Sequence, residues 1–296
     1  QAMPHRQPTA GFQFTVPTVI RSRAVNVAAN LKMIDSRKTS RYHSATPMDP
    51  LSRRLETMHR AYHRWDSPAL NRPMELLVFG HAGAPVIVFP TSQGRFYEYE
   101  DRGMVGALSH HLEQGWVQLI CVDSVDAESF YCEWAHPRGR LYRHDQYEQY
   151  ILNEVLAFVR SQNSNPFTMA HGCSFGAIHA MMFGLRYPTR FNRVLGFSGY
   201  YDIHRFLSGY HDEEVHHHNP IDIVRHLQEG QLANELRRTE IIMAIGRDDS
   251  AAGTNHELSD ALWSKGIWHA MRWWDGWAHD WPYWHRMIQM YINGAD

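Results

Sequence analysis

The chain has 296 residues, of which 44% are hydrophobic and 20% are charged, as in an ordinary globular protein with a substantial core. The net charge of -2 and the pI near 6.9 argue against a nucleic-acid or other polyanionic partner. No apolar run approaches the roughly 20 residues that a membrane span needs, so we expect no membrane span.

Three cysteines, Cys121, Cys132 and Cys173, cannot all pair with one another. We expect free thiols, which favour a reducing compartment and hence a cytoplasmic location. Residues 1–45 carry seven Lys and Arg against one acid, which is typical of a leader or a loosely attached arm. We assign them no chemistry. Residues 46–296 contain no repeat and no linker, so we expect a single domain there.

Short apolar runs alternate with longer amphipathic segments along most of the chain. The short runs predict strands at 57–65 (an edge strand), 74–80, 86–90, 116–123, 167–170, 193–199, 240–246 and 268–274. The longer segments predict helices at 103–114, 147–161, 177–187, 255–265 and 284–292. We expect a long loop at 129–143 and an insertion of loops and short helices at about 200–238.

This alternation predicts an α/β fold with a mostly parallel sheet that helices cover on both faces. In such sheets the chemistry lies beyond the carboxyl ends of the strands. A serine follows the predicted strand 167–170, two aspartates follow 240–246, and a histidine follows 268–274. We therefore expect these three kinds of side chain to meet at one edge of the sheet.

The serine belongs to Gly172-Cys173-Ser174-Phe175-Gly176, which has the Gly-x-Ser-x-Gly form of a nucleophile elbow. In that turn strand and helix approach closely, so side chains at the two glycine positions would collide with their neighbours. By composition alone the pattern occurs in about one chain in ten of this length. Its context, an apolar run before it and a helical segment after it, makes it informative.

A serine hydroxyl needs a base within hydrogen-bond reach, and the base needs a third group to orient it. The chain order serine, acid, histidine is that of the α/β-hydrolases. His279 is the expected base. Asp249 is the preferred acid because three residues after Gly246 leave the loop room to turn back, and Asp248 stays an alternative.

Acyl transfer also needs hydrogen-bond donors for an oxyanion. One is expected to be the backbone N–H of Phe175, the residue after the nucleophile. The other should come from the loop after the strand 86–90. Ser92 is our choice there, and Gln93 is the alternative.

Three motifs together resemble the putative-esterase family of α/β-hydrolases, which is related to esterase D, feruloyl esterases and bacterial mycolyltransferases. They are the elbow, the Gly246-x-x-Asp249 turn and the segment 276–284, in which His279-x-Trp281-x-x-Trp284 is the most specific piece. The resemblance covers about residues 70–292. It implies an α/β-hydrolase fold, a catalytic histidine at 279, and hydrolysis of small-molecule carboxylic esters without a cofactor.

Two departures from the family pattern leave the substrate open. Ala177 stands where many esterases have a further glycine, and the loop Thr91-Ser92-Gln93-Gly94 is not the common His-Gly oxyanion loop. An acyltransferase that uses the same three residues is the alternative function, and a non-catalytic binding module on the same scaffold is a third. The sequence does not fix the oligomeric state.

We expect most of the remaining histidines and aromatic residues discussed below to have structural roles. His216, His217 and His218 are consecutive, so their side chains point in different directions, and we expect no metal site. We expect His171 and His179, beside the elbow, to be packed and hydrogen-bonded. Most of the C-terminal tryptophans should pack in the core, with one or two at the rim of the pocket. The segment 97–99 is expected either to face substrate or to be a solvated loop.

Overall fold

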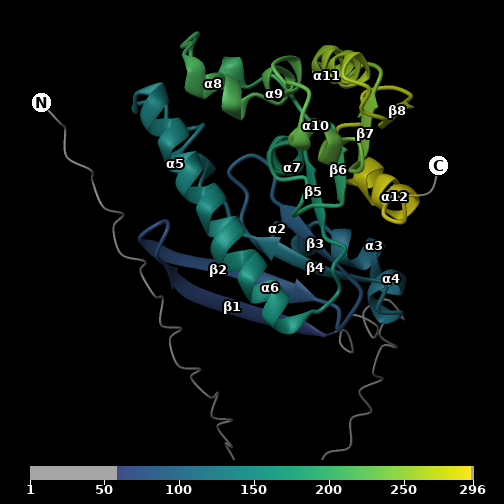
Figure 1. The fold of residues 1–296 in the computed structure, drawn as a ribbon. Helices are drawn as coiled ribbons and strands as arrows, with labels where there is room; N and C mark the ends of the chain where they lie inside the picture. Colours follow the sequence, from purple (N-terminus) through teal and green to yellow (C-terminus); the bar gives the residue numbers. More distant parts are fainter. Residues whose placement is uncertain (1–58, 295–296) are drawn as a thin grey trace, which may run out of the picture. The chain divides into compact units, whose positions relative to one another are not determined.

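The computed structural model describes residues 59–294, so the predicted arm at residues 1–45 lies outside the described residues. The described chain builds one sheet whose strand order is β1-β2-β4-β3-β5-β6-β7-β8 (Figure 1). The strands are β1 Arg60–Ser67, β2 Arg72–Phe79, β3 Ala84–Phe89, β4 Val117–Val122, β5 Met169–Cys173, β6 Arg193–Phe197, β7 Glu240–Gly246 and β8 Ala270–Trp274.

Strand directions explain why the candidate residues share one edge. β1 pairs antiparallel with β2, and β2 pairs antiparallel with β4. Every other pair is parallel, with Val88 opposite His171 and Gly246 opposite Trp274. The carboxyl ends of β5, β7 and β8 therefore point the same way, and the loops after them meet. The predicted α/β fold with a mostly parallel sheet is confirmed.

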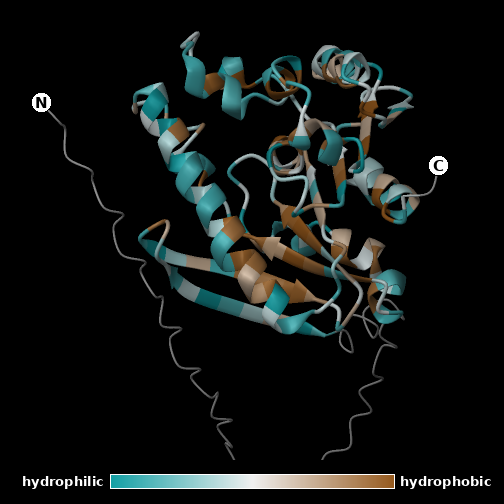
Figure 2. Cartoon of the chain, viewed as in Figure 1, coloured by the Kyte–Doolittle hydropathy of each residue, from teal (hydrophilic) through white to brown (hydrophobic). Residues whose placement is uncertain are grey.

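Both faces of the central strands are buried, which accounts for their continuous apolar sequences. In β3, Ile87 and Phe89 join one core, and Val86 and Val88 join the other. Figure 2 shows the central strands in hydrophobic brown and β1 largely in hydrophilic teal. β1 lies at the edge of the sheet, as predicted, and its residues alternate between exposed and half-buried.

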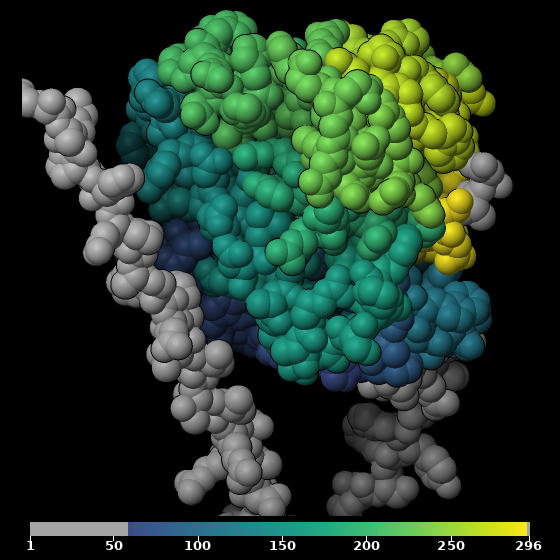
Figure 3. All heavy atoms as spheres, viewed as in Figure 1, coloured from purple at the N-terminus to yellow at the C-terminus, as the bar shows by residue number. Residues whose placement is uncertain are grey.

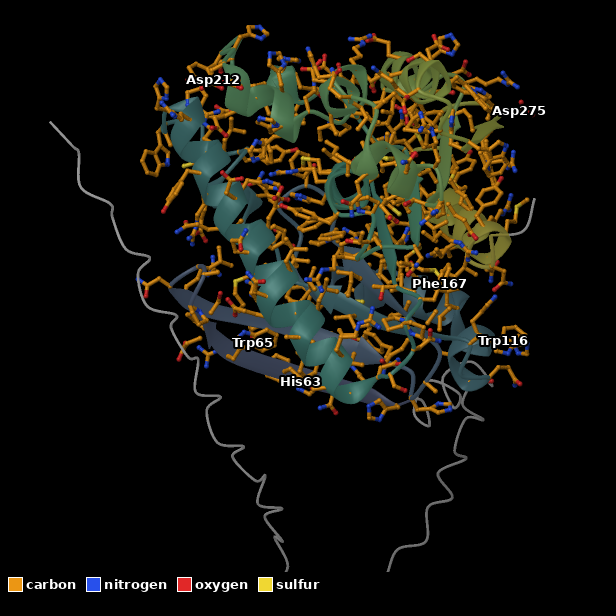
Figure 4. The ribbon with its side chains drawn as sticks, in the orientation of Figure 1. His63, Trp65, Trp116, Phe167, Asp212 and Asp275 are labelled. Atoms are coloured by element: carbon orange, nitrogen blue, oxygen red, sulfur yellow. The ribbon has the colours of Figure 1, made fainter. Side chains whose placement is uncertain are left out.

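Helices supply the partners of both cores. One core contains side chains of α5 Pro137–Gln149, the π-helical turn Tyr150–Val155, α6 Leu156–Gln162, α7 Phe175–Arg186, α9 Pro220–Arg225, α10 Gln231–Leu236 and α11 Ala252–Ser264. The other contains side chains of α2 Glu98–Asp101, α3 Met104–Ala107, α4 Ser109–Glu113 and α12 Trp281–Tyr291. Figure 4 labels His63 and Trp65 on β1, and both rings contact Phe158 of α6.

Two predicted elements differ from the structure. The helix expected at 103–114 is two short helices, α3 and α4, that meet at Leu108. The loop expected at 129–143 ends early, because α5 begins at Pro137. Proline suits the first turn of a helix, and the Nδ1 atom of His136 accepts a hydrogen bond from the N–H of Arg138 at 3.2 Å.

The segment predicted as an insertion, residues 200–238, contains the short helix η3 Ile203–Phe206 and the helices α8 Glu213–His218, α9 and α10. Figure 3 shows it in green across the upper part of the view, beside yellow α11. Within the described residues, none of the helices has the length and hydrophobicity that a bilayer crossing requires.

Candidate active site

Ser174 occupies the turn between β5 and α7 with a backbone φ of 54° and ψ of -120°, which is strained for a non-glycine residue. A Cβ atom at Gly172 would lie 2.2 Å from the carbonyl carbon of Gly176. A Cβ atom at Gly176 would lie 2.4 Å from the carbonyl oxygen of Phe89. The steric reason for the two glycines is confirmed, and the turn holds Ser174 half-exposed at the edge of the sheet.

A line of hydrogen bonds joins Ser174 to His279 and Asp249. The Nδ1 atom of His279 lies 2.6 Å from the Oδ2 atom of Asp249, and its Nε2 atom lies 3.0 Å from the Oγ atom of Ser174. Because a carboxylate only accepts, Nδ1 carries the proton and Nε2 is free to accept one from Ser174. Asp249 is buried, and its Oδ1 atom accepts a second bond from the N–H of Ala251 at 2.9 Å.

The alternative acid, Asp248, does not meet the histidine. Its side chain is exposed, and its backbone N–H donates to the carbonyl of Gly276 at 3.0 Å. The structure therefore brings Asp249, and not Asp248, to His279.

The loop after β8 is held tightly enough to fix His279. It begins near Asp275, which Figure 4 labels, and its backbone passes so close to β7 that a Cβ atom at Gly246 would lie 2.2 Å from the carbonyl oxygen of Trp277. Ser198 donates to the carbonyl of Ala278 at 3.2 Å and accepts from the Nε1 atom of Trp284 at 3.1 Å. This explains why a tryptophan stands five residues after the histidine.

Not all of the nearby tryptophans are core residues. Trp284 is buried, as expected, but Trp277 is 53% exposed. The Trp277 ring stacks on the His279 ring with 5.5 Å between their centroids and an angle of 20°. Trp277 therefore covers one face of the candidate base.

The two expected oxyanion donors line the same cavity as Ser174 and His279, with a volume of about 180 Å³. Within the described residues, neither the backbone N–H of Phe175 nor that of Ser92 has a backbone or side-chain acceptor. The alternative donor, Gln93, differs because its N–H donates to the Oδ2 atom of Asp126 at 3.1 Å. The geometry thus favours Ser92 over Gln93.

Ser92 is also held through its side chain. The hydroxyl of Tyr131 donates to the Oγ atom of Ser92 at 2.8 Å. Burial raises the pKa of Tyr131, so its hydroxyl stays protonated at neutral pH and keeps donating. The loop is fixed at its first residue as well, because Glu98 accepts from the N–H and the hydroxyl of Thr91.

The sequence interpretation missed a buried chain of polar side chains behind this loop. The Oδ1 atom of Asp126 lies 2.9 Å from the Nε2 atom of His179, whose Nδ1 atom lies 3.2 Å from the Nε2 atom of His144. All three side chains are buried. The available signal was the position of Asp126 just after the strand 116–123, at the same edge of the sheet. Asp126 therefore ties the oxyanion loop to α7.

The structure also shows the surroundings of His171 and of the segment 97–99. His171 is buried and contacts the carbonyl of Leu195 through Nδ1 at 2.9 Å, as a packed histidine should. In the segment 97–99, Tyr97 is exposed, Glu98 holds Thr91, and Tyr99 is buried in the core.

Two of the three consecutive histidines, His216 and His218, contact different carboxylates. His216 contacts Asp222, and His218 contacts Asp145 at 2.8 Å. His218 also approaches His144 and Glu148 closely enough for the three to hold a metal ion. However, Glu148 already pairs with Arg186 and accepts from Tyr187 at 2.8 Å. Because a guanidinium already neutralises that carboxylate, we propose no metal there.

Comparison with known proteins gives a family and a fold. The sequence matches the family described as "Putative esterase" over residues 67–292, whereas no curated protein matches it. A ferulic acid esterase structure superposes with a TM-score of 0.66 at 17% identity, covering 79% of this chain and 96% of that one.

Two further structures are similar. An S-formylglutathione hydrolase from Agrobacterium tumefaciens gives a TM-score of 0.63 at 16% identity and covers 80% of this chain and 94% of that one. The fluorophosphonate-binding serine hydrolase FphF from Staphylococcus aureus gives a TM-score of 0.62 at 16% identity and covers 80% of this chain and 98% of that one. The resemblance inferred from the three motifs is thus confirmed: the chain belongs to the putative-esterase family of α/β-hydrolases.

Proposed function

We propose that the protein is a serine carboxylesterase that works through an acyl-enzyme intermediate. The observation that carries the proposal is the hydrogen-bonded line from Ser174 through His279 to Asp249, at 3.0 Å and 2.6 Å. Membership of an esterase family supports the same chemistry.

The proposed reaction follows from the orientation of each group. Ser174 attacks the ester carbonyl while the Nε2 atom of His279 takes its proton, and Asp249 stabilises the imidazolium that forms. The backbone N–H groups of Phe175 and Ser92 donate to the oxyanion, and each such donor typically contributes about 2.7–4 kcal/mol in the transition state. His279 then protonates the leaving alcohol, and water attacks the acyl-enzyme by the same route.

The exposure of the base allows water to act as the acyl acceptor. The His279 side chain is 24% exposed, so solvent reaches the group that must activate the second nucleophile. Transfer to an alcohol would use the same residues and remains the alternative. Product analysis with and without an added alcohol separates the two: free acid alone supports the esterase, and a new ester supports the transferase.

The proposal is tested with p-nitrophenyl acetate, on wild type and Ser174→Ala. Ser161→Ala is the matched control, because Ser161 is an exposed serine on α6 whose hydroxyl donates only to the carbonyl of Phe158. We expect Ser174→Ala to abolish turnover while thermal unfolding is unchanged, and Ser161→Ala to keep full activity. Retained activity in folded Ser174→Ala would overturn the proposal, and an inactive wild type would support the binding-module alternative.

A further inference from the structure

The cavity at Ser174 has walls of aromatic side chains and a single positively charged side chain at its rim. Tyr131, Phe175 and Phe206 line it, and their rings contact one another with centroids 5.1–5.5 Å apart. Arg205, an exposed residue of the short helix η3, lines the same cavity. No Asp or Glu is among the described residues that line it. The cavity is therefore lined by aromatic rings and serine hydroxyls, and Arg205 is the one Lys or Arg among its described lining residues.

Arg205 is held in place by rings rather than by a carboxylate. Its guanidinium carbon lies 4.4 Å from the centroid of Tyr200 and 5.4 Å from that of Phe206. Within residues 59–294, no carboxylate lies within salt-bridge distance of it. The acid nearest to Arg205 in the sequence, Asp202, contacts His204 instead, at 2.5 Å. None of the described residues therefore neutralises the charge of Arg205 through an ion pair.

We propose that Arg205 binds a carboxylate carried by the substrate, so that the preferred substrates are esters with an anionic group. This inference rests on the proposed esterase function. A guanidinium presents a planar pair of donors that matches a carboxylate, and stacking on aromatic rings orders it beforehand. At about 180 Å³ the cavity is smaller than the roughly 300–1,000 Å³ of pockets for drug-sized ligands, so only a short spacer fits between ester and carboxylate.

The carboxylate could belong to the acyl group or to the alcohol, and two substrate pairs separate these cases. Mono-p-nitrophenyl adipate carries the charge on its acyl group and is compared with p-nitrophenyl hexanoate. 4-Acetoxybenzoate carries it on the alcohol and is compared with phenyl acetate. The two members of the second pair differ in their leaving groups, so the ratio of kcat/KM values within each pair is compared between wild type and variant, and the intrinsic reactivities cancel.

Arg205→Gln removes the charge, and Arg205→Lys keeps it without the planar donors. Arg190→Gln is the matched control. It removes the same single charge from the protein, and Arg190 is an exposed arginine that does not line the cavity. For one of the two pairs, we expect Arg205→Gln to lower kcat/KM of the anionic ester about tenfold and that of the neutral ester less than about twofold. Arg205→Lys should fall between, and Arg190→Gln should match wild type.

An equal loss on charged and neutral esters in Arg205→Gln would overturn the inference and assign the arginine to packing against Tyr200. An unchanged preference would also overturn it. A binding measurement keeps the inference separate from the proposed function. In the Ser174→Ala protein, calorimetry should show tighter binding of the anionic ester than of its neutral partner, and adding Arg205→Gln should remove the difference. Selective binding without hydrolysis in wild type would refute only the esterase proposal, and hydrolysis without selectivity would refute only the anion site.

Discussion

Replacing Asp249 by Asn tests how the structure orients the candidate base. The Oδ1 atom of Asp249 accepts from the N–H of Ala251 at 2.9 Å, and its Oδ2 atom contacts His279 at 2.6 Å. In Asp249→Asn the amide oxygen will keep the bond to Ala251, because an amide nitrogen cannot accept it. The NH2 group then faces Nδ1 of His279, so Nδ1 must accept and the ring proton moves to Nε2.

With its proton on Nε2, His279 cannot take the proton of Ser174. The same change of tautomer in a serine protease lowers kcat about 10⁴-fold, and at 1.36 kcal/mol for each factor of ten this is about 5.4 kcal/mol in the activation barrier. We expect a loss of that order in kcat on p-nitrophenyl acetate. The volume of the side chain is unchanged, so thermal unfolding should move little.

Asp248→Asn is the matched control, because Asp248 is an exposed neighbour that does not contact His279. It removes the same charge one residue away and should leave kcat within about twofold of wild type. The reasoning is wrong if folded Asp249→Asn keeps a tenth of wild-type kcat, or if Asp248→Asn loses as much as Asp249→Asn.

Three further predictions concern the elbow, the oxyanion loop and acid stability. Gly172→Ala places a Cβ atom 2.2 Å from the backbone of Gly176, so we expect about 3 kcal/mol less unfolding free energy in urea denaturation; a loss below about 0.5 kcal/mol would contradict the steric argument. Asp126→Asn weakens the anchor of Gln93 at 3.1 Å and should lower kcat about tenfold with little change in KM; a change in KM alone would contradict a role in positioning. Burial lowers the pKa of His171 to about 4, below its usual 6.5, so the unfolded chain binds the proton more readily. His171 therefore contributes to the free energy of unfolding fully above pH 6.5, and this contribution of about 3 kcal/mol is lost as the pH falls toward 4. We expect His171→Gln to reduce the fall in the free energy of unfolding between pH 6.5 and pH 4, measured by urea denaturation. An unchanged pH dependence would contradict the assignment.

The sequence predicted most of what depends on local pattern and topology. Strands buried on both faces, such as Ala84–Phe89, have continuous apolar sequences that stand out from amphipathic helices. The order of strands and helices then brings the ends of β5, β7 and β8 together, which is why Ser174, Asp249 and His279 could be named before their distances were known. The choice between Asp248 and Asp249 depended on loop geometry, which the spacing after Gly246 only suggested.

Contacts between distant segments could not be predicted in this way. Asp126 meets the N–H of Gln93, 33 residues away, and His179, 53 residues away, and nothing in the local sequence of either partner indicates the pairing. The position of Arg205 could not be predicted either. A segment of short helices has no strong hydrophobic periodicity, so the sequence does not indicate which of its residues face the site. The start of α5 at Pro137 was missed since its first turns are rich in charged residues.

The central claim is that Ser174 is an activated nucleophile, and the most direct test is to find which residue reacts with a fluorophosphonate. The wild-type protein is labelled at neutral pH, digested and sequenced by mass spectrometry, with Ser174→Ala treated in parallel. We predict a single adduct on Ser174 and no labelling of Ser174→Ala. An unlabelled wild type, or an adduct on another residue that persists in Ser174→Ala, would contradict the account.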